Sequence, residues 1–87
     1  MNNPSQFLTE AKQGVVTVVF KKINSDEIRV MPCTLNKDLS NGNANITDTD
    51  PNSDHFAVWC LDKDAWRSFR ANTVIEWYKG YPENNEL

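Results

Sequence analysis

Residues Phe56 to Trp77, FAVWCLDKDAWRSFRANTVIEW, decide the fold, because this quarter of the chain holds all three tryptophans and two of the three arginines. Its aromatic and β-branched residues suit a pleated, half-buried surface, and the Asp and Asn residues between them suit turns. The stretch therefore predicts a meander of three short strands, at Phe56–Leu61, Trp66–Arg70 and Val74–Tyr78. Residues 71–73, before the last strand, suit a single turn of 3₁₀-helix.

The middle strand of this meander carries an unusual mixture of aromatic and cationic side chains. Side chains alternate between the two faces of a strand. One face is therefore expected to carry Trp66, Ser68 and Arg70, and the opposite face Arg67 and Phe69. The alternation places one arginine on each face.

A helix is predicted ahead of the first strand, over residues 4–13 with proline at its first position. Asn3 and Gln6 have the spacing of a capping box. A helix of about ten residues is marginal by itself in water, so it has to dock on the rest of the fold. We expect Phe7 and Leu8 to close one open end of a barrel.

The strongest strand signal of the chain is the β-branched run over Val15–Lys22, which is typical of a central strand covered on both faces or of a strand at a barrel corner. A turn at residues 24–27 leads into a second strand over Ile28–Leu35. Pro32 cannot donate a ladder hydrogen bond, so it marks an edge or a bulge there. The two strands together predict a hairpin.

The second strand begins with an arginine in apolar surroundings, Arg29. The nearest acidic residues in the chain are Asp26 and Glu27, which precede it in the turn. One interpretation is an ion pair with one of these two residues at the rim of the sheet. The other is that the guanidinium contacts a ligand.

A polar connection over residues 36–54 separates the hairpin from the meander. Connections of this length are uncommon inside a compact domain, so we expect a functional or mobile loop that is partly disordered. Oxygen-bearing side chains alternate along its second half, at Asp48, Asp50, Asn52 and Asp54. The glycine and the final glutamate of a calcium loop are missing, so no metal is predicted. The acidic tail, residues 79–87, is expected to fray.

Length and charge limit the possible classes of protein. Eighty-seven residues make one domain with a small core, and the net charge of −3 argues against a nonspecific nucleic-acid coat, although it permits a local basic patch. No apolar run approaches the roughly 20 residues of a membrane span, and no signal peptide is visible, so a cytoplasmic location without membrane binding is expected. Cys33 and Cys60 are then predicted to be buried free thiols.

The elements add up to a mainly-β chain: a short helix, a hairpin, a long loop and a three-stranded meander. The predicted domain spans residues 1–87, with its core over about 15–78. Small, strongly twisted sheets cover their edges by curling into a barrel. We therefore expect a five-stranded SH3-like (Sm-like) barrel with a short N-terminal helix.

Three segments of the chain carry a family resemblance. Leu61–Arg70 resembles the closing half of WYL domains, which are Sm-like SH3 barrels of bacterial transcription regulators. The whole chain looks similar to small stand-alone WYL-like proteins of tailed phages and gut bacteria, which are largely uncharacterised. The segments that match are Phe20–Lys22, Arg29–Leu35 and Trp66–Arg70, and the resemblance covers roughly residues 15 to 78.

The resemblance implies that Arg67 and Arg70 face a ligand, as arginines do in WYL domains. Two departures accompany it. Asp54-His55-Phe56 stands where those domains place their Trp-Tyr-Leu triad, and Ala71-Asn72-Thr73-Val74 replaces their usual Leu-Asp-Arg-Ile. One of the cations that line the ligand site of WYL domains is therefore absent.

Two functions follow from these residues, neither of them enzymatic. His55 is the only histidine, and no glycine-rich phosphate loop is present, so neither an enzyme nor a bound cofactor is predicted. The first hypothesis is a binding module that grips a nucleotide or single-stranded nucleic acid. Arginines would pair with phosphate and aromatic faces would stack on bases. The candidate binding residues are Arg67 and Arg70 for phosphate, with Arg29, Trp59 and Trp66 shaping the platform.

The predicted role of the tryptophans and the predicted function each have an alternative. Trp59 and Trp66 can equally fill a small core, with arginine stems packed over their rings. The second function is a phage protein-interaction module that binds a host or phage protein through an exposed strand edge or the 36–54 loop. Open strand edges also make oligomers by strand pairing possible.

Overall fold

The computed structural model describes residues 1–44 and 49–82. Within these residues the chain forms one helix and five strands in the predicted order: α1 (Pro4–Gln13), β1 (Val15–Lys21), β2 (Ile28–Thr34), β3 (His55–Cys60), β4 (Ala65–Arg70) and β5 (Val74–Lys79). The 3₁₀ turn η1 (Ala71–Thr73) separates β4 from β5 as predicted. Every strand boundary lies within one residue of its predicted position. The prediction of a mainly-β, five-stranded fold is confirmed.

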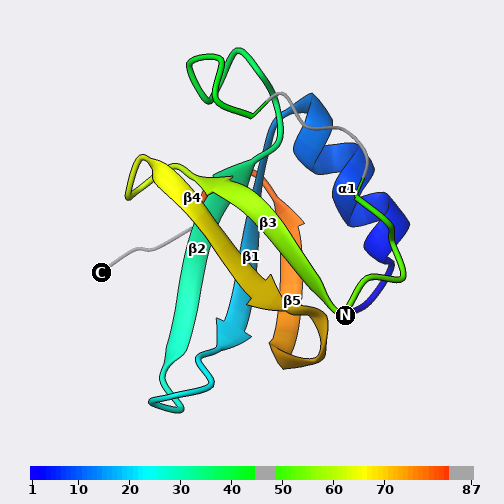
Figure 1. Ribbon diagram of the computed structural model, residues 1–87, viewed down its shortest axis with the longest axis vertical. Helices are drawn as coiled ribbons and strands as arrows, with labels where there is room; N and C mark the ends of the chain where they lie inside the picture. The colour runs from blue at the N-terminus through cyan, green and yellow to red at the C-terminus, as the bar shows by residue number, and fades with distance from the viewer. Residues whose placement is uncertain (45–48, 83–87) are drawn as a thin grey trace.

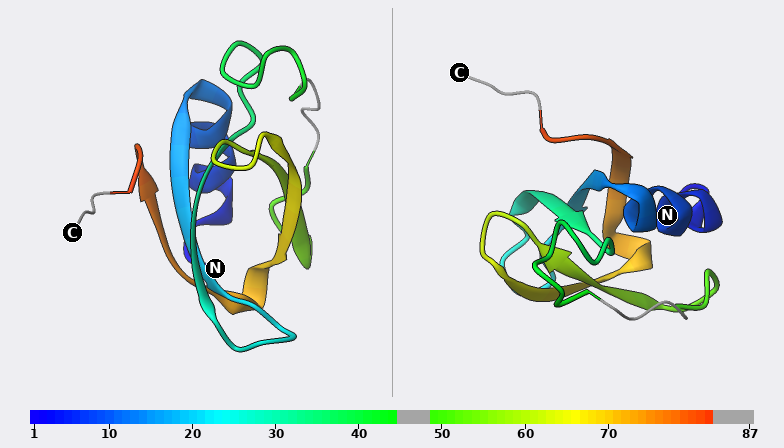
Figure 2. Two further views of the ribbon diagram at one scale, coloured as in Figure 1. Left: turned by 90° about the vertical axis from the view of Figure 1, so that its left-hand side faces the viewer. Right: turned by 90° about the horizontal axis from the view of Figure 1, so that it is seen from above.

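The strands form one antiparallel sheet in the order β4-β3-β2-β1-β5. Figures 1 and 2 show that this sheet is strongly curled, with β3 and β4 crossing in front of β1 and β5. β1 pairs with both β2 and β5, and its residues Val16, Thr17 and Val18 are all buried. The continuous β-branched run therefore marks an interior strand that is paired on both sides, although the middle strand of the sheet is β2.

The pairing of β2 with β3 is short, and Pro32 explains why. The two strands align only at Cys33 opposite Cys60 and Thr34 opposite Trp59, followed by a hydrogen bond of 2.9 Å from Leu61 N–H to the Pro32 carbonyl. Proline has no N–H to return that bond, so the ladder ends there. In the described part of the chain, the first half of β2 is paired on one side only.

Helix α1 packs its apolar face into the barrel core. Phe7 is fully buried, and its ring centroid lies 5.9 Å from Phe69, 5.4 Å from Trp77 and 6.1 Å from Phe56. Edge-to-face ring pairs add to the energy of burial. The prediction that the helix residues close one end of the barrel agrees with this packing.

The predicted capping box at the start of α1 is wrong. Asn3 has a left-handed backbone (φ 51°) and makes no side-chain capping bond, whereas an N-cap residue normally has β-region angles. Gln6 instead donates to Glu10 one turn ahead, at 2.7 Å. The Asn3 carbonyl still accepts the Phe7 N–H at 3.0 Å, so the helix begins at its proline without the side-chain cap.

The C-terminal end of α1 is tied to the end of β2. The Thr34 hydroxyl donates to the Gly14 carbonyl at 2.7 Å and also accepts the Asn36 N–H at 3.0 Å. Leu35 N–H bonds to the Ala11 carbonyl at 2.8 Å. Thr34 is fully buried, and its hydroxyl also makes a buried contact with the Ala11 carbonyl at 3.1 Å.

Thr34→Val is expected to lower the free energy of unfolding by about 1–2 kcal/mol, because the Ala11 and Gly14 carbonyls and the Asn36 N–H lose their hydroxyl partner. Urea unfolding measures the change. Thr9→Val is the matched control: that hydroxyl bonds to the Ser5 carbonyl on the exposed face of the helix, so a change within about 0.5 kcal/mol is expected. Equal losses in the two variants would contradict a structural role for Thr34.

The described parts of the long loop are held by local hydrogen bonds. The Asn36 side-chain carbonyl accepts two backbone N–H groups, and the buried Ser40 hydroxyl donates to the Asn36 carbonyl at 2.9 Å. Asp50 accepts the Asn52 N–H at 2.9 Å in an Asx turn. Asp48, the first member of the acidic alternation, lies outside the described residues. In the described segments no three His, Cys, Asp or Glu side chains are grouped to hold a metal.

Cys33 and Cys60 are free, fully buried and opposite one another across the β2–β3 pair. Burial raises the pKa of the Cys33 thiol, with a further contribution from the nearby Cys60. A thiol that stays protonated is a poor nucleophile, so Cys33 acts as a small apolar core residue. The helix found among the described residues falls short of the length and apolar character that crossing a membrane requires.

Candidate functional site

A cavity of about 750 Å³ opens between the β1–β2 hairpin and β4. It lies where the short β2–β3 pairing leaves the sheet open. The end of β1, the start of β2, most of β4 and Thr73 of η1 form its walls, and His55 contributes from the start of β3. Ligand pockets of proteins are typically about 300–1,000 Å³, so this cavity has the size for a small organic ligand.

Positive charge is concentrated around this cavity. Six of the nine lysines and arginines of the chain line it, including all three arginines: Lys21, Lys22, Arg29, Lys63, Arg67 and Arg70. None of the described Asp or Glu residues lines it. A concave surface lined by one sign of charge focuses the electric field, so this pocket attracts anions although the whole chain has a net charge of −3.

The floor of the cavity is aromatic. Phe20 and Phe69 stack with ring centroids 5.5 Å apart and an interplanar angle of 29°. Phe69 is buried and also contacts Phe7 of the core, whereas Phe20 is half-buried. The two rings therefore separate the pocket from the core, and Phe20 offers part of its ring to the cavity.

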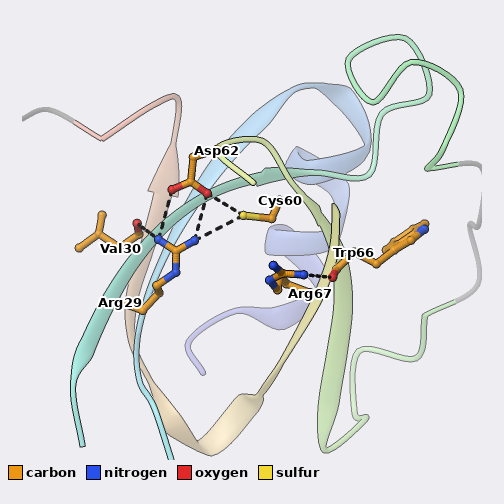
Figure 3. Close-up of polar contacts among 6 residues, drawn as sticks. All are labelled: Arg29, Val30, Cys60, Asp62, Trp66 and Arg67. Atoms are coloured by element: carbon orange, nitrogen blue, oxygen red, sulfur yellow. Dashed lines mark hydrogen bonds and ion pairs between the residues drawn. The ribbon is translucent and has the colours of Figure 1, made fainter. Parts of the chain in front are cut away.

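Arg29 reaches the cavity from β2 but is held by an acidic partner. Its Nη2 lies 3.0 Å from Asp62 Oδ1 and its Nη1 lies 3.2 Å from Asp62 Oδ2, a bidentate ion pair (Figure 3). Nη1 also donates to the Val30 carbonyl at 3.4 Å and Nη2 to Cys60 Sγ at 3.5 Å. The Cys60 thiol in turn donates to Asp62 Oδ1 at 2.7 Å. Arg29 is the centre of a small polar network.

The expected rim ion pair of Arg29 therefore exists, but with a different partner. The turn acids Asp26 and Glu27 approach Lys21 and Lys22, each at 3.9 Å. Those lysines flank the same turn of the hairpin and so reach its acids first. Arg29 instead meets a carboxylate brought from the β3–β4 turn.

The Arg29 guanidinium lowers the pKa of Asp62 from its ordinary value, against the opposing effect of burial. A lowered pKa means that the folded state favours the carboxylate. The pair therefore stabilises the fold above about pH 4, and its contribution is lost as the pH falls further, through the folded pKa. Both side chains are partly exposed, so the contribution at neutral pH is small, about 1 kcal/mol or less.

The stability difference between the wild type and Asp62→Asn is accordingly expected to shrink below about pH 4. Thermal unfolding at a series of pH values measures it. Asp64→Asn changes the net charge equally in the same turn, and Asp64 has no ion pair in the described chain. A wild-type advantage over Asp62→Asn that persists unchanged at pH 3 would contradict the assignment.

Arg67 and Arg70 have no such carboxylate. No described Asp or Glu lies within ion-pair distance of either residue. Arg67 Nη1 donates to the Trp66 carbonyl at 3.0 Å, and its side chain points into the space between β2 and β4 (Figure 3). Arg70 belongs to the other face by alternation, but it ends β4, where the chain turns into η1, and it lines the same cavity.

The two predicted tryptophans lie away from this cavity. Trp59 and Trp66 are register partners on β3 and β4, with ring centroids 5.8 Å apart and planes at 90°. Neither lines the cavity, and Trp66 points away from Arg67 (Figure 3). Trp59 is buried and Trp66 is partly exposed. The structure thus gathers the three predicted arginines and separates the two tryptophans from them.

The cavity residues that the sequence reasoning missed include three cations and an aromatic ring: Lys21, Lys22, Lys63 and Phe20. A signal for Phe20, Lys21 and Lys22 was present. A hairpin closed by the 24–27 turn puts Phe20 directly opposite Arg29, as the observed register does. The residues that end β1 therefore lie beside that arginine. Lys63 comes from the β3–β4 turn. No local sequence pattern predicts that this turn approaches β2.

The fold and the cavity define a small SH3-like β-barrel with an N-terminal helix and a cation-lined opening between strands. The chain belongs to the WYL_2 family, described as an Sm-like SH3 β-barrel fold, whose model matches residues 5–75. The match runs from the first turn of α1 into β5. No curated protein and no solved structure matches the chain in the same comparisons. The resemblance to WYL domains and the predicted barrel are confirmed.

Proposed function

We propose that this protein is a non-enzymatic binding module whose cavity takes a phosphate-bearing ligand, either a nucleotide or a segment of single-stranded nucleic acid. One observation carries the proposal: two thirds of the cationic residues of an acidic chain surround a single cavity that no described carboxylate lines. Arginine suits phosphate because the planar guanidinium fork can bind two of its oxygens at once.

Each group of cavity residues is expected to contact a different part of the ligand. Arg67 and Arg70, which have no acidic partner among the described residues, bind the phosphate. Lys21 and Lys22 add positive charge at the mouth, where their long exposed pairs with turn acids cost little to break. Phe20 offers an apolar ring to the base or sugar of the ligand. A base stacked on an aromatic ring is worth about 1–3 kcal/mol.

The composition of the cavity supports binding rather than catalysis. Ser68 and His55 both line it, but no described carboxylate is there to orient the imidazole as a general base. General acid–base chemistry needs groups of matched proton affinity held within hydrogen-bond reach of the substrate. A cation-lined wall with an apolar floor instead supplies charge and contact area.

Fluorescence anisotropy of labelled oligothymidylate and oligouridylate, roughly ten nucleotides long, tests the proposal at about 50 and 200 mM salt. With about three phosphates neutralised, the affinity is expected to fall about twentyfold between these concentrations. Competition with AMP distinguishes the two ligand sources. If AMP displaces the labelled oligonucleotide at concentrations similar to those at which the oligonucleotide itself binds, the cavity is a nucleotide site. If AMP does not displace it, the cavity is a single-strand site. Absence of binding by every probe at low salt, or binding that salt does not weaken, would contradict the proposal.

A second candidate function rests on the strand edge that Pro32 leaves unpaired. Ile28 and Val30 of β2 are exposed, as is Ile23 in the preceding turn, with exposed fractions of 54%, 41% and 63%. An unpaired edge beside apolar side chains suits the addition of a strand from a host or phage protein. Such binding would survive high salt and fail in a Val30→Pro variant, the opposite of the result expected for the cavity.

A further inference from the structure

Arg29 differs from the other cavity arginines because its hydrogen-bonding capacity is already used. A guanidinium has five N–H donors. The two terminal amino groups of Arg29 make four hydrogen bonds, two of them to Asp62. Arg67 makes a single side-chain bond, to the Trp66 carbonyl, and none is found for Arg70 in the described chain. The cavity thus holds one engaged arginine and two available ones.

The carboxylate that engages Arg29 is itself fixed in place. Asp62 lies two residues after the end of β3 and accepts a hydrogen bond from the Cys60 thiol at 2.7 Å, in addition to those from both terminal guanidinium nitrogens of Arg29. It does not line the cavity, although Arg29 does. The hydrogen bonds from Arg29 favour its charged form. A fixed negative charge therefore stands behind one wall of the cavity, and Arg29 and Asp62 together present almost no net charge to a ligand.

We propose that Asp62 is a specificity-determining residue that neutralises Arg29, and so makes the pocket favour a monophosphate or a phosphodiester chain over a polyphosphate. The inference rests on the proposed function. The phosphate then binds on the side of Arg67 and Arg70, while the neutral side, with Arg29 and the adjacent Met31, faces the uncharged part of the ligand. The repulsion between the Asp62 carboxylate and the ligand increases with the negative charge of the ligand. Removing this carboxylate should therefore raise the affinity for polyphosphates most.

Asp62→Asn and Asp64→Asn make a matched pair for the test. Both remove one negative charge from the β3–β4 turn and leave every cavity residue unchanged. Asp64 has a left-handed backbone (φ 51°), which asparagine tolerates well, and no ion pair in the described residues. Any difference between the two variants therefore reports the contacts of Asp62 with Arg29 and Cys60 rather than net charge.

Oligothymidylate, AMP and ATP are the probes, measured by anisotropy and by competition. Asp62→Asn is expected to bind oligothymidylate about three- to tenfold more tightly than the wild type, with a salt slope steeper by about 0.7. The gain for ATP should exceed the gain for AMP. Asp64→Asn should stay within about twofold of the wild type. Equal affinities in the two variants, or weaker binding by Asp62→Asn, would overturn the inference while the wild type still binds.

A second variant keeps the inference testable if Asp62→Asn is poorly folded. The double variant Arg29→Gln, Asp62→Asn removes both charges of the pair, so its affinity for oligothymidylate should not show the gain expected of Asp62→Asn. A loss of more than about tenfold would show that Arg29 contacts the ligand directly, and would overturn the inference. If the wild type and all variants bind none of the probes at low salt, the proposed function fails and the inference fails with it.

Discussion

Replacing Phe7 by alanine is expected to lower the free energy of unfolding by about 3–5 kcal/mol, the largest effect of any single truncation considered for this protein. Phe7 is fully buried and contacts three aromatic rings, those of Phe56, Phe69 and Trp77. These rings come from β3, β4 and β5, so the side chain joins the helix to three strands. The loss would remove much of the roughly 5–15 kcal/mol that stabilises a small domain.

Urea unfolding followed by tryptophan fluorescence measures this change. Ile75→Ala is the matched control, because Ile75 is a large apolar residue with 60% of its surface exposed. Its truncation should change the free energy of unfolding by no more than about 0.5 kcal/mol. A loss below about 1 kcal/mol for Phe7→Ala would contradict the view that the helix closes the core.

The double variant Arg67→Ala, Arg70→Ala is expected to bind oligothymidylate about 100-fold more weakly than the wild type. A hydrogen bond to a charged group is worth about 1.5–3 kcal/mol, and loss of about 3 kcal/mol in total corresponds to that factor. The salt slope should also become shallower, by about 1.4. Both side chains are exposed, so the melting temperature should be nearly unchanged.

Lys12→Ala, Lys37→Ala is the control for this variant. It also removes two positive charges, but from exposed positions that do not line the cavity. The control should stay within about threefold of the wild type if the cavity binds the ligand. Equal losses in both double variants would show that the affinity comes from overall charge, and would contradict a specific site.

The fold was predictable because its signals are local. The β-branched run of β1, the turn residues at 24–27 and the aromatic meander each specify a strand or turn within a few residues. The capping box was mispredicted because Gln6 has a second possible partner, Glu10, one helical turn ahead, and its side chain bonds to that residue instead. Sequence spacing alone does not fix the left-handed backbone of Asn3, which decides between the two.

The candidate site was only partly predictable, because it joins residues that are distant in the chain. The resemblance to WYL domains directed attention to Arg67 and Arg70, and the cavity contains both. The contact between Arg29 and Asp62 spans 33 residues, so no local pattern announced it. Trp66 was expected in the same platform as the arginines, yet the alternation along β4 already put it on the face opposite Arg67.

Chemical-shift mapping by NMR tests the central claim, the phosphate-binding cavity, most directly. Oligothymidylate and AMP would be titrated at low salt into labelled protein, with the methyl groups of Met31 and Thr73 and the ring of Phe20 reporting on the cavity. The indole groups of Trp59 and Trp66 report on the opposite face. If the cavity binds the phosphate, the largest chemical-shift changes fall on these methyl groups and on the Phe20 ring. They disappear in the double variant Arg67→Ala, Arg70→Ala. Shifts concentrated on the two indoles, or on Val30 at the edge of β2, would contradict this claim.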